Sequence, residues 1–334
     1  MNAATLKYSG CAQRGVSLVE LMVAIVIGLV LTGGILQLYI QSKQSYNTLE
    51  ALAEIQENGR YAIDTIARDL RRAGYWGGNA DIDEPTTTGT QPPVPPNGTC
   101  NTGDNTWGRM VTQRIYGVDS GTGTRTPAFD PGISMGACLP AASQLRGDIV
   151  AMRYASPWEV AIADMEANRL YVRSSLFTGR IFNGSEQASN VITADPHKTT
   201  ELIGHAYYIR PSAQTCRGAA VPALWHVTLD NSGQPVSEEL ALGVEQVQVQ
   251  YGVDNNAPAG SVNQYVNADP TWSATDWRNV IAARVWVLVR SQCPQVGYTD
   301  TNTYTMGNVT YDPSDDSFLR QLYVTTVMLR NPNL

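Results

Sequence analysis

The sequence of 334 residues predicts an α+β protein, with a long N-terminal α-helix that spans a membrane in its first half and packs on an antiparallel β-sheet domain with long loops. Three observations carry this prediction. Residues 21–40 form an uncharged apolar run, residues 43–78 continue with helical spacing, and residues 148–334 contain short β-like runs. With 43% hydrophobic and 16% charged residues, the chain can bury a sizeable core.

The apolar run from Leu21 to Ile40 is twenty residues long and carries no charge. As a helix rising about 1.5 Å per residue it spans roughly 30 Å, the thickness of a bilayer core. Glu20 lies directly before it among apolar residues, and a carboxylate in a membrane segment indicates function because its burial is costly. A secretory signal cut near Thr32 is the alternative, but the apolar run continues past that position.

The N-terminal segment QRGVSLVELMVAIVIGLVL places Gly15 before Val16 and Glu20 one helical turn further on. It closely resembles the class III signal of type IV prepilins and pseudopilins. The resemblance implies that a prepilin peptidase cleaves after Gly15, removes residues 1–15 as a leader and methylates the new N-terminus at Val16. It also implies that Glu20 pairs with the α-amino group of a neighbouring subunit in a filament and so sets the axial register.

The charges around the apolar run predict its orientation. Lys7 and Arg14 precede the span, so the positive-inside rule places the following residues in the periplasm. We therefore expect a single-pass protein with its C-terminal part in the periplasm. The resemblance to pilins implies the bacterial inner membrane before assembly and an extracellular location at a pilus tip afterwards. The retained helix is expected over residues 16–42 as the membrane and filament-core segment.

Loss of the leader would leave four of the five cysteines. An even number of cysteines in an oxidising compartment favours disulfides, and four cysteines allow three pairings. Sequence order favours Cys100 with Cys138 and Cys216 with Cys293.

Residues 43–78 predict an amphipathic helix that continues into the globular domain. Gly74, Gly77 and Gly78 are expected to end it. The residues expected on one buried face, at three- and four-residue steps, are Leu49, Leu52, Gln56, Gly59, Ile63, Ile66 and Leu70.

Residues 79–147 are rich in Thr, Pro, Gly and Asn and predict a variable, loop-rich region. Residues 148–334 predict a β-rich C-terminal domain with a hairpin turn at 230–233. The expected strands are Asp148–Tyr154, Leu170–Arg173, His205–Arg210, Ala223–Leu229, Val244–Val253, Val280–Arg290 and Leu322–Arg330.

Three of these segments, LGVEQVQVQYGVD at 242–254, DWRNVIAARVWVLVRS at 276–291 and YVTTVMLRN at 323–331, resemble the C-terminal half of PilW-type minor pilins. The resemblance implies a non-enzymatic structural subunit that helps to prime pilus assembly and sits in the tip complex. It implies as partners other minor pilins, the major pilin, the prepilin peptidase and a large tip adhesin.

Two other functions share the same signal. One is a minor pseudopilin of a type II secretion system, similar to the J-type subunit. The other is a ligand- or DNA-binding tip module that uses the loops of residues 79–147. A formal charge of −7 excludes nucleic-acid binding by bulk charge, so no nucleic acid is expected as a partner.

The sequence motifs that would indicate catalysis or metal binding are weak. Residues 132–136 read G-x-S-x-G around Ser134, but prolines flank the motif where a nucleophile elbow needs a strand and a helix. The three histidines lack the spacing of a zinc site. We expect no cofactor, with calcium as the one candidate metal. The oxygen ligands considered for calcium are Asp300, Asn302, Asp312, Asp315 and Asp316.

Overall fold

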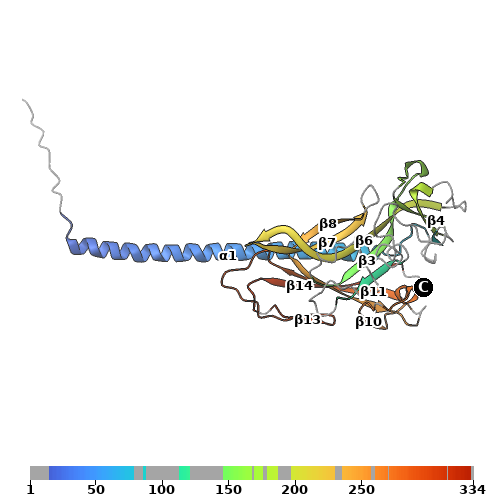
Figure 1. Ribbon diagram of the computed structural model, residues 1–334. Coiled ribbons are helices and arrows are strands. Elements are labelled where there is room, and N and C mark those ends of the chain that lie inside the picture. Colours follow the sequence, from blue (N-terminus) through green and yellow to red (C-terminus); the bar gives the residue numbers. More distant parts are fainter. Residues whose placement is uncertain are drawn as a thin grey trace, which may run out of the picture. The chain divides into compact units, whose positions relative to one another are not determined.

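The computed structural model describes residues 15–78, 86–87, 113–120, 146–167, 169–175, 179–186, 197–229, 235–256, 260–269, 271–313 and 315–331. The chain forms two compact units, residues 1–50 and residues 51–334. Helix α1 (Leu18–Arg72) begins in the first unit and ends in the second (Figure 1). All the described strands belong to the second unit.

The larger sheet has eight strands in the order β1-β5-β4-β6-β3-β2, with β7 added beside β6 and β8 beside β7. All its pairings are antiparallel except β1 with β5. The strands are β1 (Thr86–Thr87), β2 (Ile115–Val118), β3 (Ile149–Glu159), β4 (Leu170–Ser175), β5 (Gly179–Asn183), β6 (His197–Cys216), β7 (Ala219–Leu229) and β8 (Pro235–Leu242).

The smaller sheet is fully antiparallel and has the order β10-β9-β11-β14. A separate hairpin pairs β12 with β13. These strands are β9 (Val244–Val253), β10 (Gln264–Val266), β11 (Val280–Arg290), β12 (Tyr304–Met306), β13 (Val309–Tyr311) and β14 (Arg320–Met328). The short helices are η3 (Ile162–Asp164), η4 (Gly184–Glu186) and α3 (Ala274–Arg278).

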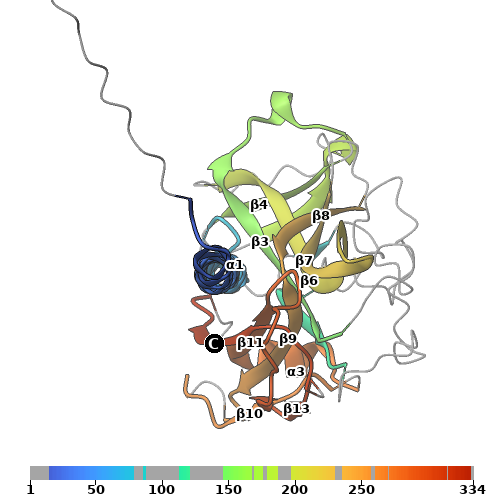
Figure 2. The ribbon, with the colours of Figure 1, turned by 90° about the vertical axis from the view of Figure 1, so that its left-hand side faces the viewer.

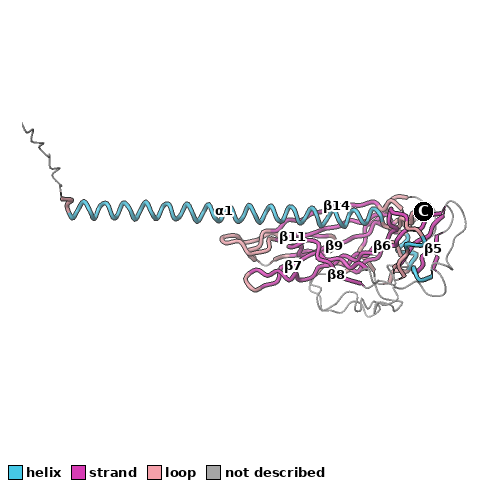
Figure 3. Tube along the Cα trace, turned by 90° about the horizontal axis from the view of Figure 1, so that it is seen from above, coloured by secondary structure: helices cyan, strands magenta, loops and turns pink. Residues whose placement is uncertain are grey.

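Both sheets and the second-unit part of α1 share one hydrophobic core. Figure 2 looks along α1 and shows β3 and β4 of the larger sheet and β9 and β11 of the smaller one on the same side of the helix. Strand β14 runs beside the helix (Figure 3). The buried residues of α1 are Ala51, Ile55, Gly59, Ala62, Ile63, Ile66, Ala67, Asp69 and Leu70.

The buried face of α1 differs in part from the one that the sequence predicts. Gly59, Ile63, Ile66 and Leu70 are buried as expected and Leu52 is half-buried. Leu49 and Gln56 are exposed, and Ile55 takes the place of Gln56. A series of strict three- and four-residue steps drifts around a helix of 3.6 residues per turn, so the register slips by one position toward the N-terminus.

The strands at Val244–Val253 and Val280–Arg290 have the bounds that the sequence predicts. Strand β6 is much longer than expected, since His205–Arg210 is only its centre. In the loop-rich region 79–147, the described residues include the short strands β1 and β2. The motif around Ser134 and the hairpin turn at 230–233 lie outside the described residues.

Candidate functional site

The candidate cleavage site lies immediately before α1. Residues 15–17 are exposed and not helical, and α1 begins at Leu18. The hydroxyl of Ser17 accepts a hydrogen bond from the backbone N–H of Glu20 at 3.2 Å, and its carbonyl accepts from Leu21 at 3.1 Å. Ser17 therefore caps the helix N-terminus, and the bond between Gly15 and Val16 lies in exposed backbone next to a helix.

The first-unit part of α1 presents an apolar surface that is exposed among the residues the structure describes. The helix is long and apolar enough to cross a membrane, and none of the residues in its apolar window is buried. The run from Leu21 to Ile40 contains many large side chains that are at least half exposed. Such a continuous apolar surface requires lipid or another protein to cover it.

Glu20 is the only charged residue from Gly15 to Ser42. It lies in the first turn of α1 on the exposed apolar surface, where a negative charge also suits the helix N-terminus. In an apolar environment its carboxylate needs a cationic partner. The segment supplies no basic side chain, so the partner is either the α-amino group that cleavage would create at Val16 or a group of another molecule.

A buried polar network joins the other end of α1 to the larger sheet. Asp69 accepts hydrogen bonds from the hydroxyls of Tyr154 on β3 and Tyr207 on β6, at 3.0 and 2.6 Å. Nδ1 of His205 lies 2.6 Å from the same carboxylate, and the ring of His226 is 4.7 Å from that of His205. This network ties the helix to two neighbouring strands through side chains that come from distant parts of the chain.

The network controls the charge of its members. Burial alone would raise the pKa of Asp69, but the hydrogen bond and charge of His205, with the hydrogen bonds of Tyr207 and Tyr154, hold this pKa below its usual range. Burial lowers the pKa of His226 although its Nε2 lies 3.0 Å from the carboxylate of Glu238. Asp69 is therefore an anion at neutral pH, and His226 is neutral.

The end of α1 is fastened to β3 by backbone hydrogen bonds. Gly74 adopts φ +77°, a left-handed conformation that favours glycine, and its N–H donates to the carbonyl of Arg153 at 3.0 Å. The N–H of Ala155 donates to the carbonyl of Tyr75 at 2.6 Å. The glycine that the sequence predicts as the helix stop therefore also turns the chain onto the sheet.

A disulfide joins Cys216 at the end of β6 to Cys293 just after β11, with 5.5 Å between the two Cα atoms. This is one of the two pairings that sequence order favours, and it links the larger sheet to the smaller one across 77 residues of chain. Cys100 and Cys138, the other expected pair, lie outside the described residues.

The acidic residues considered as calcium ligands do not form an open oxygen cluster. Asp300 and Asp316 both accept hydrogen bonds from the guanidinium of Arg320, at 3.0 and 2.6 Å, and Glu245 accepts from the same group at 2.7 Å. Burial opposes the charge of Arg320, but these three carboxylates raise its pKa above the usual value. Across the described residues, no group of three or more acidic, histidine or cysteine side chains could hold a metal ion.

Sequence reasoning missed Asp69 and its network. Arg60, Asp64, Arg68 and Arg72 recur every fourth residue and predict a charged, solvated face of the helix, but Asp69 lies outside this series. Its spacing in the sequence could have revealed it: Asp69 lies seven residues after Ala62 and three after Ile66, so it shares the buried face of the helix with them. An acid at such a position predicts buried hydrogen-bond donors.

Two family models match the chain. The model of the type IV pilus-assembly protein W, PilW, matches residues 206–331, and the model of the prokaryotic N-terminal methylation motif matches residues 11–36. The first match runs from β6 to the end of β14, and the second covers the candidate cleavage site and most of the apolar run.

The comparisons with individual proteins give only one weak structural similarity. No curated protein matches the chain. A solved type IV-like pilin from Thermus thermophilus is 16% identical and aligns over 56% of this chain and 80% of its own length, with a TM-score of 0.29. A likeness of this level says nothing about the arrangement of the strands. The two family matches show what the chain resembles: a prepilin-type methylation motif at its N-terminus and PilW-type minor pilins over residues 206–331.

Proposed function

We propose that the protein is a non-enzymatic structural subunit of a type IV pilus that helps to prime pilus assembly and sits in the tip complex. One observation carries the proposal. An exposed apolar helical surface begins directly after Gly15 and Val16, holds Glu20 as its only charge, and belongs to a chain that matches PilW over residues 206–331. The match to PilW favours the pilus over a type II secretion system.

Before assembly, the helix anchors the chain in the bacterial inner membrane with the β domain on the periplasmic side. The basic residues Lys7 and Arg14 ahead of the span support this orientation. A disulfide between Cys216 and Cys293 agrees with an oxidising compartment. After assembly the domain is extracellular, at the pilus tip.

During maturation, a prepilin peptidase cleaves after Gly15 and methylates Val16. Cleavage removes the leader with its two cations and leaves an α-amino group one helical turn from Glu20. In a filament of packed helices, this amine lies against the Glu20 carboxylate of a neighbouring subunit. The pairing is strong because an unpaired charge in an apolar core is costly.

The pilin family implies contacts with other pilus components. We propose that these are other minor pilins and the major pilin through the helix, and a large tip adhesin through the β domain. The proposal requires no cofactor, and neither calcium nor catalysis has a part in it.

The first experiment determines the mature N-terminus. The full chain is expressed with and without a prepilin peptidase and analysed by mass spectrometry. We expect a chain that begins at methylated Val16 only with the peptidase. A Gly15→Val variant should remain uncut, whereas Gly10→Val, a matched change in the leader, should be processed normally. An N-terminus at Ile35 or beyond would refute the proposal.

The second experiment separates processing from assembly. Glu20→Gln should be cleaved and methylated, but its incorporation into pili should fall by about tenfold or more, because the buried amine loses its partner. Glu57→Gln removes a carboxylate from the exposed surface of α1 in the second unit and serves as the control. Equal incorporation of the two variants in immunoblots of sheared pili would contradict the role of Glu20.

A further inference from the structure

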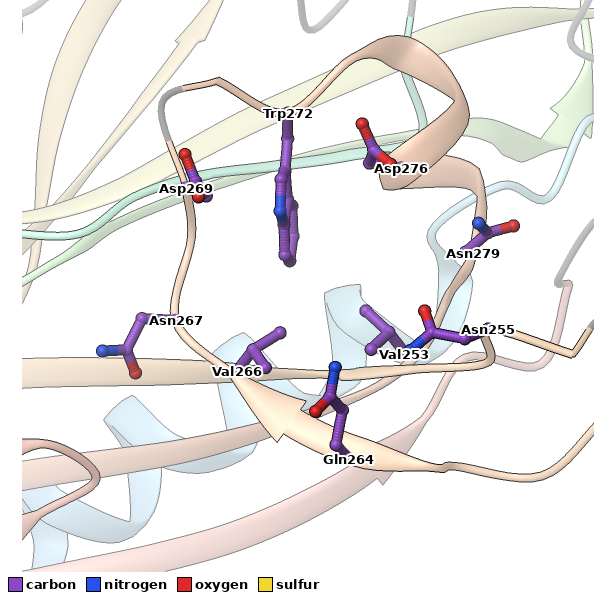
Figure 4. Close-up of a pocket in the computed structure, with 9 residues that line it drawn as sticks. All are labelled: Val253, Asn255, Gln264, Val266, Asn267, Asp269, Trp272, Asp276 and Asn279. Atoms are coloured by element: carbon purple, nitrogen blue, oxygen red, sulfur yellow. The ribbon is translucent and has the colours of Figure 1, made fainter.

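A small open cavity lies beside the edge strand of the smaller sheet. It has a volume of about 210 Å³ and lies between the end of β9, the edge strand β10, the segment that follows β10, and α3. Figure 4 shows its lining. The lining residues are Val253, Asn255, Gln264, Val266, Asn267, Asp269, Trp272, Asp276 and Asn279.

The indole of Trp272 forms the aromatic wall of this cavity. It projects from the segment between Asp269 and Asp276 toward the strand residues below it (Figure 4). The rings of Trp277 and Tyr251 meet it nearly at right angles, with centroids 4.8 and 6.2 Å away. Trp277 and Tyr251 are themselves buried, so they fix the indole in place before any ligand arrives.

Two carboxylates hold fixed positions on either side of the indole. Asp269 accepts hydrogen bonds through Oδ1 from the hydroxyl and backbone N–H of Thr271, at 2.6 and 2.8 Å. Asp276 accepts through Oδ2 from the hydroxyl and N–H of Ser273, both at 2.7 Å. These hydrogen bonds hold the pKa of each carboxyl below its usual range, so both are anions that keep a second oxygen for a ligand.

Four amide side chains complete the lining. Asn267 accepts a hydrogen bond from Gln250 through its oxygen, at 3.1 Å, which leaves its NH₂ group to donate. Asn255 and Gln264 point toward the open space below Trp272 and each offers both an amide donor and a carbonyl acceptor, whereas the amides of Asn267 and Asn279 point outward (Figure 4). Val253 and Val266 add apolar surface at the floor of the cavity (Figure 4).

This combination identifies the chemistry of the ligand. Two carboxylates with no basic residue in the lining repel an anion. A metal ion or an ammonium group accepts no hydrogen bonds, so it would use the carboxylates and amide oxygens but not the amide NH₂ groups. A sugar hydroxyl both donates and accepts, and the C–H face of a sugar ring suits an indole and two valines.

We propose that this cavity binds an uncharged sugar ring, one unit of a glycan whose remainder extends into solvent. A volume of about 210 Å³ is below the roughly 300–1,000 Å³ of pockets for drug-sized ligands and suits a single ring. The carboxylates and amides select adjacent hydroxyls, and Trp272 selects the ring face. The site goes beyond the structural role of a pilin subunit and adds glycan recognition to the domain that the helix carries.

The test uses the full chain in a polyoxyethylene detergent, so that no sugar-based detergent competes. Glucose, galactose, mannose and N-acetylglucosamine are titrated separately and followed by calorimetry and ligand-observed NMR. We expect at least one of them to bind, and lysine, sodium phosphate and calcium chloride not to displace it. Absence of binding across the four sugars, or displacement by lysine or calcium, would overturn the proposal.

Two variants place the binding in the cavity. Trp272→Ala should weaken binding by about tenfold or more, and Gln264→Ala should weaken it by a few-fold. Gln264→Ala should leave the melting temperature unchanged, because Gln264 is exposed on a three-residue edge strand. Trp158→Ala, which removes a tryptophan that is 78% exposed on β3, is the matched control and should bind like the natural chain. Normal binding by both cavity variants would place the sugar elsewhere and refute the site.

Discussion

The contact between Gly59 and Tyr323 offers a sharp test of how α1 packs on β14. A Cβ atom added at Gly59 would lie 2.2 Å from Cε2 and 2.6 Å from Cζ of Tyr323. The Tyr323 ring cannot simply move aside, because its hydroxyl donates to the carbonyl of Ile55 at 3.2 Å, one turn earlier on the helix. Gly59→Ala therefore forces either the ring or the helix to shift.

Two opposing effects determine how Gly59→Ala changes the free energy of unfolding. Alanine is favoured over glycine in a helix by about 1 kcal/mol, whereas overpacking of a well-filled contact costs about 1–3 kcal/mol. Gly59→Ala should therefore lower the free energy of unfolding by up to about 2 kcal/mol in the natural chain. In a Tyr323→Ala background the clash is absent, so Gly59→Ala should raise the free energy of unfolding by about 1 kcal/mol.

Urea denaturation of the four proteins in this cycle, followed by circular dichroism, measures both effects. Gln56, exposed on the same helix, provides the control: Gln56→Gly and Gln56→Ala should differ by about 1 kcal/mol in either background. The reasoning fails if Gly59→Ala stabilises the natural chain, or if its effect is the same with and without the Tyr323 ring.

Three further predictions concern the second unit. Cys216→Ser with Cys293→Ser should lower the free energy of unfolding by about 4.5 kcal/mol, the loop-entropy value for 77 residues, and an unchanged urea midpoint would contradict this. Because the pKa of His226 is lowered in the folded state, stability falls as the pH drops below the unfolded value of 6.5. His226→Gln should flatten this part of a stability–pH curve, and identical slopes would argue against it. Arg320→Met should cost about 3–5 kcal/mol by stranding the buried carboxylate of Asp300, and a loss that stays the same at pH 3 would contradict this origin.

Strands with a strong side-chain pattern were predictable from the sequence. Strands β9 and β11 are buried over nearly their whole length and are rich in valine, so their bounds agree with the prediction. Strands β8 and β10, with the sequences PVSEELAL and QYV, are polar or very short, and their pairing partners hold them in place. The local sequence pattern does not reveal a strand that forms because neighbouring strands pair with it.

The long strand β6 shows the same limit. Only its centre carries the apolar and aromatic pattern, while its ends contain lysine, threonine and a proline. The first part pairs with β4 and β3, and the last part pairs with β7 across a register shift after Pro211. The extra length therefore comes from three partners in turn, which a single window of sequence does not show.

The candidate assembly segment could be proposed from the sequence because all its residues lie close together in the chain. Cleavage, membrane insertion and the charge of Glu20 depend on residues within a few helical turns. By contrast, the Asp69 network joins residues up to 138 positions apart, and Arg320 meets Glu245 from 75 positions away. The sequence around Asp69 does not show its partners, because only the fold brings Tyr154 and Tyr207 to it.

Under the proposed function, the exposed surface of α1 suits two environments in succession. Its large apolar side chains suit lipid before assembly and neighbouring helices afterwards, so hydrophobicity alone does not favour one environment over the other. Contacts that only the filament supplies must make the difference. Glu20 is such a group, because lipid offers it no cation and a neighbouring N-terminus does. Loss of the Glu20 charge should therefore leave membrane anchoring intact and impair assembly alone.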